Sequence, residues 1–144
     1  MKLNKLVTGV ATTGLLLLLA GCGFKLDNKM LSADGGVWSV SQGHYYQFTQ
    51  DGDVSIYEDG SKVSTGTYSV SDNKDDYELT LDLKGEHLGA VTSKVTIDVP
   101  KKNQNSNEFK GTAKISAGIK DNEIDAGSDS MTFTKEKEDV LENN

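Results

Sequence analysis

The chain has 144 residues and a formal net charge of -7, with 22 acidic residues against 15 basic ones. Every basic residue is Lys, and this acidic balance argues against nucleic acid or an anionic lipid surface as a partner. The single cysteine, Cys22, excludes an intramolecular disulfide framework.

The first segment has the order of parts of a secretory signal. Lys2 and Lys5 precede an apolar run over residues 6–19, and the run closes on Leu19-Ala20-Gly21-Cys22. This tetrapeptide resembles the lipobox of bacterial lipoproteins. The alternative is an uncleaved membrane helix with an incidental cysteine, but residues 6–19 are short for a span of about 20 residues.

The resemblance to lipoproteins implies a location in the cell. Residues 1–21 would be the signal peptide, and Cys22 would carry a thioether-linked diacylglycerol, whose two acyl chains, such as palmitate, give stable anchoring. Loss of Lys2 and Lys5 would change the formal charge from -7 to -9. We expect the mature protein on the outer face of the cell membrane, and the composition resembles that of a Gram-positive bacterium.

Residues 22–34 are polar and do not alternate, so we expect a lipidated tether there, with a short helical turn possible over 27–31. Beyond it the pattern changes to period two, which predicts about eight half-buried strands. The inward positions are Trp38, Val40, Tyr46, Phe48, Val54, Ile56, Tyr68, Val70, Tyr77, Leu79, Leu81, Leu83, Val95, Ile97, Val99, Phe109, Ala113, Ile115, Met131 and Phe133.

Turn residues separate these predicted strands. Asp51-Gly52 and Asp59-Gly60 tolerate the positive φ of tight hairpins, and Pro100 stands where the strand around Val95 stops. Short consecutive hairpins favour an all-β fold, a single eight-stranded antiparallel up-and-down barrel over residues 35–135, because closure removes exposed strand edges. Residues 136–144 form a charged tail, with a turn or two of helix expected near 135–141. Because the strands are expected to be short, any cavity should be smaller than in a barrel of long strands.

One motif carries a resemblance to a fold family. Gly36-Val37-Trp38, at the start of the first strand, resembles the G-x-W signature of the lipocalins, which are calycin-type β-barrels. The resemblance implies a barrel that can hold a small ligand. Lipocalins usually carry an Arg late in the barrel that packs across this Trp, and here Lys135 or Lys137 would take that place.

Trp38 has two interpretations. It either plugs the barrel end where the tether enters, or lines a ligand cavity with aromatic neighbours. Eight residues are therefore candidates for the ligand pocket or the barrel core: Trp38, Tyr46, Phe48, Ile56, Tyr68, Leu81, Ile97 and Phe133.

The sequence contains no recognisable catalytic or metal-binding motif. His44 and His87 lie near no recognisable nucleophile motif and are interpreted as solvated loop residues. The acidic run 121–129 resembles a calcium loop but fails the EF-hand template, so we interpret it as a connection between the last two strands. We predict no enzyme activity, no cofactor and no metal.

Two functions remain open. The first is uptake of a small apolar or amphipathic ligand by a monomeric, membrane-anchored barrel. The second is an acidic protein-interaction domain that binds a basic protein, such as an inhibitor of a host or competitor lysozyme, since complementary charge steers association. The released fragment ending at Gly21 could also act as a peptide signal.

Overall fold

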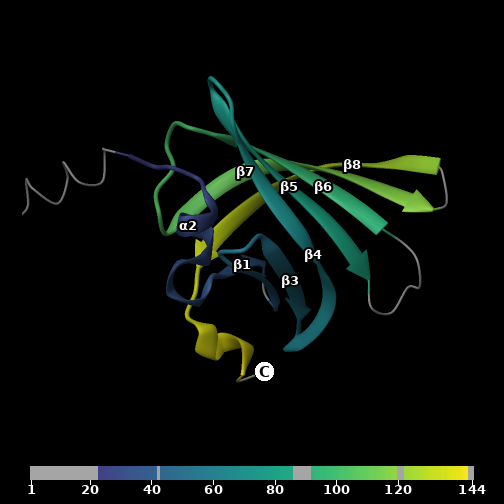
Figure 1. Ribbon diagram of the computed structural model, residues 1–144, viewed down its shortest axis with the longest axis horizontal. Helices are drawn as coiled ribbons and strands as arrows, with labels where there is room; N and C mark the ends of the chain where they lie inside the picture. The colour runs from purple at the N-terminus through teal and green to yellow at the C-terminus, as the bar shows by residue number, and fades with distance from the viewer. Residues whose placement is uncertain (1–22, 42, 86–91, 120–121, 143–144) are drawn as a thin grey trace, which may run out of the picture.

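The architecture is a closed β-barrel. The computed structural model describes residues 23–41, 43–85, 92–119 and 122–142. Each of eight antiparallel strands pairs with the next along the chain, and the last pairs with the first through Trp38–Lys135 and Ser39–Thr134 (Figure 1). The predicted eight-stranded up-and-down barrel is confirmed.

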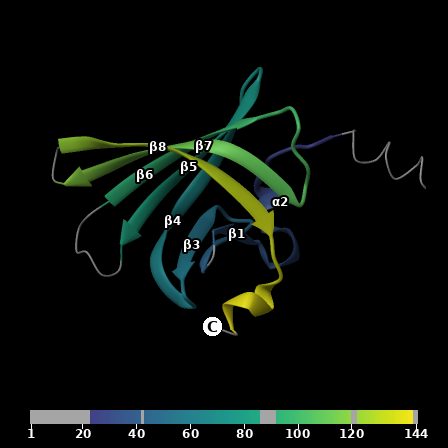
Figure 2. The ribbon, with the colours of Figure 1, turned by 180° about the vertical axis from the view of Figure 1, so that it is seen from behind.

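The strands differ strongly in length. Three short strands come first, and five longer strands follow, running well past the short strands in Figures 1 and 2. The expectation of uniformly short strands is wrong, because the last two strands hold 12 and 14 residues. The strands are β1 (Val37–Ser41), β2 (His44–Phe48), β3 (Asp53–Glu58), β4 (Ser61–Asp72), β5 (Asp76–Gly85), β6 (Thr92–Pro100), β7 (Glu108–Ile119) and β8 (Asn122–Lys135).

The last hairpin changes one interpretation of the sequence. Residues 122–129, expected to be an acidic connection, belong to strand β8 and pair with β7. Residue 121 lies outside the described part of the chain. After β8 the expected helical turn is present as the short 3-10 helix η2 (Glu138–Leu141).

The hairpin turns follow the predicted chemistry. Asp59 and Gly60 both have positive φ, 46° and 77°, as a two-residue hairpin loop between β3 and β4 requires. Gly52 has φ 95° in the β2–β3 loop, and Pro100 is the last residue of β6. The turn residues therefore end the strands where the sequence predicts.

Trp38 is the centre of the packed half of the barrel. Its side chain is fully buried, and its Nε1–H donates a hydrogen bond of 2.9 Å to the carbonyl oxygen of Leu31. The indole meets the Phe109 ring edge-on at 5.2 Å between centroids. The Lys135 ammonium lies 5.6 Å from the indole centroid and 3.1 Å from the carboxylate of Asp34. Lys135 therefore occupies the place expected for a basic residue across the Trp.

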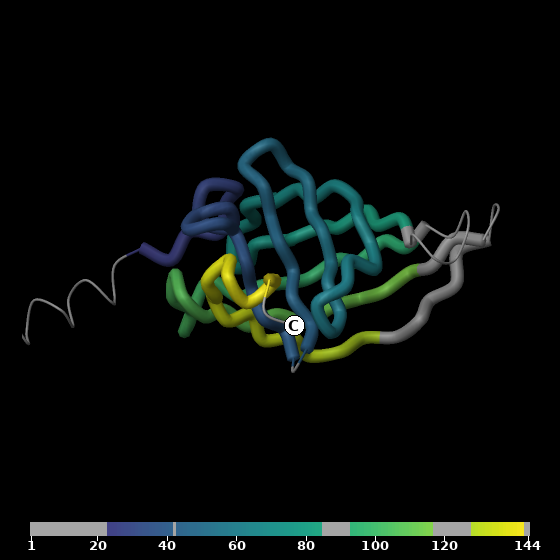
Figure 3. Tube along the Cα trace, turned by 90° about the horizontal axis from the view of Figure 1, so that it is seen from below, coloured from purple at the N-terminus to yellow at the C-terminus, as the bar shows by residue number. Residues whose placement is uncertain are grey.

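The N-terminal segment packs on the same end of the barrel, unlike the free tether expected over residues 22–34. Leu26 and Leu31 belong to the buried core, with 2% and 0% of their surfaces exposed. The Phe24 ring packs 5.8 Å from Tyr77 and 6.2 Å from Phe109, and the Tyr77 hydroxyl donates to the Phe24 carbonyl at 3.4 Å. We call this end, with the loops 49–52, 73–75 and 101–107, the closed end (Figure 3).

A short helix, α2 (Asn28–Ser32), caps the closed end and is followed by the 3-10 turn η1 (Ala33–Gly35). Asp27 is the N-cap of α2, because its Oδ1 accepts a hydrogen bond from the Met30 N–H at 2.9 Å. This hydrogen bond lowers the pKa of Asp27. Ser32 and the Gln50 side chain form a 3.1 Å hydrogen bond that joins α2 to the β2–β3 loop. No helix within the described ranges is long and apolar enough to cross a membrane.

The Trp38 arrangement makes a stability prediction. Trp38→Ala removes a buried indole and should lower the free energy of unfolding by about 3–5 kcal/mol. Trp38→Phe keeps most of the packing but leaves the Leu31 carbonyl without its donor, which should cost about 1–3 kcal/mol. Urea denaturation measures both values. Lys84→Ala, at an exposed position of β5, should change the stability by less than about 0.5 kcal/mol and is the control.

The docked N-terminal segment makes a second prediction. A chain that begins at Gly36 loses Leu26 and Leu31 and should unfold at a lower urea concentration than a chain that begins at Gly23. Burial of those two leucines is worth roughly 1.5–3 kcal/mol each. Equal denaturation midpoints for the two chains would show that the segment is a free tether after all.

Candidate ligand cavity

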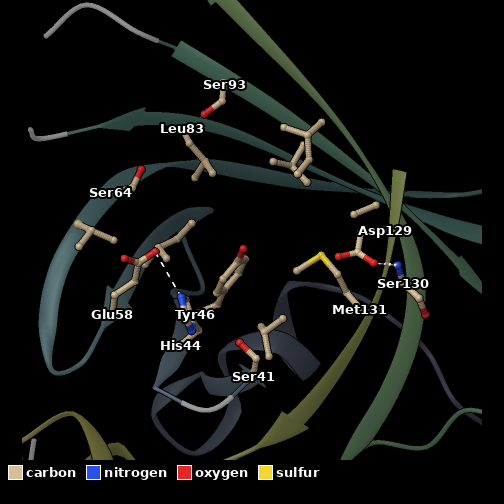
Figure 4. A pocket seen from close by; sticks show the side chains of 16 residues that line it. Ser41, His44, Tyr46, Glu58, Ser64, Leu83, Ser93, Asp129, Ser130 and Met131 are labelled. Atoms are coloured by element: carbon tan, nitrogen blue, oxygen red, sulfur yellow. Dashed lines mark hydrogen bonds and ion pairs between the residues drawn. The ribbon is translucent and has the colours of Figure 1, made fainter. Parts of the chain in front are cut away.

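The barrel half opposite the closed end is hollow. A cavity of about 840 Å³ lies between the strands, and Figure 4 shows side chains entering it from several sides. Residues from all eight strands line it: Val40, Ser41, His44, Tyr46, Ile56, Glu58, Val63, Ser64, Leu83, Ser93, Val95, Ala113, Ile115, Asp129, Ser130 and Met131.

Side-chain size along each strand explains why one half is filled and the other hollow. On β7 the inward positions run from Phe109 at the closed end to Ala113 beside the cavity. On β6 they run from Val99 to Ser93, and on β8 from Phe133 to Met131. Bulky residues therefore meet at one end, and smaller or more flexible ones leave space at the other.

An aromatic layer of the packed core lies directly under the cavity as its floor, and Tyr46 is the member of this layer that lines the cavity. The Tyr46 ring meets Phe133 edge-on at 5.7 Å, and Phe133 stacks on Phe109 at 4.6 Å with an interplanar angle of 7°. Phe48 lies 6.4 Å from Tyr46 and 4.9 Å from Tyr68. These contacts hold Tyr46 at the boundary between the packed core and the hollow half.

The Tyr46 hydroxyl is the polar group on this floor. Burial, with a smaller contribution from the Glu58 carboxylate, raises the pKa of Tyr46 above its ordinary value, so the phenol stays protonated at neutral pH. It meets no hydrogen-bond partner among the residues that the structure describes. A bound molecule can therefore accept or donate a hydrogen bond at this hydroxyl.

Ionisable groups stand on the cavity wall above the floor. His44 Nε2 lies 3.5 Å from Glu58 Oε1, joining the facing ends of β2 and β3. Across the cavity in Figure 4, Asp129 projects from β8, and its Oδ1 accepts the backbone N–H of Ser130 at 2.8 Å. The cavity wall is thus mainly apolar and carries a few hydrogen-bond acceptors and hydroxyl groups.

The structure divides the eight predicted candidates. Tyr46 and Ile56 line the cavity. The other six are at most 6% exposed, do not line it and form the packed half: Trp38, Phe48, Tyr68, Leu81, Ile97 and Phe133. Trp38 accordingly occupies the position of the plug. Tyr68 donates its hydroxyl hydrogen to the Thr49 carbonyl, and burial raises its pKa to about 12.

Sequence reasoning missed the polar residues of the cavity. His44 was assigned to a loop, but it begins strand β2 and lines the cavity. Glu58 was not singled out, and Asp129 was considered only as the end of the acidic run 121–129, although each stands two positions from an inward apolar residue, Ile56 and Met131. Continuing the period of two past the last apolar residue would have found them. His87 lies outside the described residues.

Comparisons with known proteins add no assignment. Searches against family models, curated proteins and solved structures found no match to this chain. Within the described ranges, no group of three or more His, Cys, Asp or Glu side chains is placed to hold a metal ion.

Proposed function

We propose that the protein is a membrane-anchored extracellular lipoprotein whose barrel takes up a small apolar or amphipathic molecule without catalysing a reaction. The observation that carries this proposal is the cavity of about 840 Å³ with largely apolar walls. Small-molecule sites in proteins enclose roughly 300–1,000 Å³ and combine apolar walls with a few polar groups.

The barrel supports ligand uptake because rigid elements of the fold surround its cavity. The wall is made of paired strands, and the floor is fixed by the stacked rings of Phe109 and Phe133. A ligand then gains from burial of apolar surface, about 25 cal/mol per Å², with little cost of ordering the protein. Ile115, 37% exposed, offers apolar surface that such a ligand would cover.

The docked N-terminal segment supports a defined orientation of the anchored protein. Phe24 is held against Phe109 and Tyr77 at the closed end, and it stands two residues after Cys22 in the sequence. A lipid on Cys22 would hold the closed end near the membrane. The cavity, in the opposite half, would face away from it.

Ligand uptake is tested with a neutral fluorescent probe. The chain from residue 23 onward should bind an environment-sensitive apolar dye with saturable enhancement of fluorescence. Leu83→Trp with Met131→Trp fills the cavity from opposite walls and should weaken dye binding at least about tenfold, or about 1.4 kcal/mol. Thr132→Trp adds the same side chain at the neighbouring position of β8, which is not part of the cavity lining, and should leave the affinity unchanged.

Native mass spectrometry of the protein purified from its own cells tests the same function without a chosen probe. A bound small molecule of defined mass supports uptake. An empty barrel together with unsaturable dye binding contradicts it, and inhibition of a basic protein such as lysozyme at low salt would then favour the protein-interaction alternative.

The anchor is tested separately. Cys22→Ala should release the protein from the membrane fraction and abolish its labelling by a clickable palmitate analogue, since the thiol is the site of diacylglycerol attachment. Thr132→Trp keeps Cys22 and should remain in the membrane fraction. A Cys22→Ala protein that still sediments with membranes would contradict lipid anchoring.

A further inference from the structure

The ionisable groups that line the cavity carry one sign of charge apart from a histidine. Glu58 on β3 and Asp129 on β8 enter it, on opposite sides of the cavity in Figure 4, and His44 stands beside Glu58. Among the residues that the structure describes, no Lys lines the cavity. The cavity therefore presents acceptors and negative charge to whatever enters it.

Three lysines on the neighbouring strands β4, β6 and β7 lie away from the cavity. Lys62 rests its ammonium 5.6 Å from the Tyr57 ring centroid, and Lys114 pairs with Asp98 at 3.1 Å. Lys94 immediately precedes Val95, which lines the cavity, so it occupies the opposite face of β6. These three lysines are consequently on the outer surface, while Glu58 and Asp129 line the cavity.

From this separation of charge we infer that the cavity selects amphiphiles with a cationic, hydrogen-bond-donating head group, such as an alkylammonium, over anionic ones such as fatty acids. This inference rests on the proposed uptake of a small ligand. A carboxylate accepts hydrogen bonds but donates none, so Glu58 and Asp129 favour a head group with N–H donors.

Placement of the ligand follows from the cavity walls. The alkyl chain contacts the apolar side chains Ile56, Val95 and Ile115, and the ammonium lies beside Glu58 or Asp129. An anionic head group in the same place meets the like charge of Glu58 and Asp129, which repels it, whereas a cationic head group is attracted. The Tyr46 hydroxyl can bond either kind of head group, so it does not set the preference.

Three amphiphiles of equal chain length test the inference. Dodecylamine, dodecanol and dodecanoate compete with the neutral dye for the chain from residue 23 onward at neutral pH and moderate salt. Dodecylamine should bind at least about tenfold more tightly than dodecanoate, and dodecanol should be intermediate. Glu58→Gln with Asp129→Asn should reduce the tenfold preference to less than about threefold while leaving dodecanol binding unchanged.

Asp82→Asn, which removes one negative charge where the double substitution removes two, is the control for surface charge. Asp82 is exposed on β5 and precedes the cavity residue Leu83, so its replacement changes the net charge without changing the cavity. The preference for dodecylamine should survive this change. Equal affinities for the three compounds, a preference for dodecanoate, or loss of the preference in Asp82→Asn would overturn the inference. Failure of all three, dodecanol included, to displace the dye or bind would instead contradict ligand uptake itself.

Discussion

The buried hydrogen bond from Trp38 Nε1 to the Leu31 carbonyl is the contact on which the closed end depends. A buried indole N–H needs an acceptor, and this acceptor comes from helix α2, outside the barrel strands. The indole can be buried only if the segment before β1 is in place. Phe109 of β7 and Lys135 of β8 complete the surroundings of the ring. The side chain of Trp38 on β1, the first strand, therefore contacts the last two strands.

Packing at that end leaves the other half free to stay hollow. The largest fully buried side chains, among them Phe48, Phe109 and Phe133, gather in the closed half and supply its core. A barrel of eight strands is just wide enough for side chains to fill, so space appears only where inward residues are small. Ala113 and Ser93 are such residues on β7 and β6, and the cavity lies beside them.

The same two-faced geometry of a strand separates charge between the inside and the outside of the barrel. On β3 the inward positions carry Ile56 and Glu58, while Tyr57 between them meets Lys62 on the outer face. Lys114 on β7 is likewise paired with Asp98, away from the cavity. This acidic chain thus has carboxylates both on its outer surface and at the cavity, whereas Lys62 and Lys114 lie on the outer surface.

The sequence by itself determined the strands, their turns and their closure. Alternation of apolar and polar residues specifies which side chains face inward, and Asp59-Gly60 with positive φ fixes a hairpin register. In a sheet of eight consecutive hairpin-connected strands, pairing of the first strand with the last leaves no exposed edge. The role of Lys135 across Trp38 was also among the alternatives that the sequence offered.

Only the tertiary structure decided what each inward position does. Period two gives the face of a side chain but not its height along the barrel axis, so Tyr46 at the cavity and Phe48 in the core look alike in sequence. Leu26 and Leu31 stand in a polar stretch without period, and their burial depends on the closed end formed by distant strands. The size of the inward side chains changes along single strands, but the packed half and the hollow half arise only where strands far apart in the chain bring residues of like size to the same height.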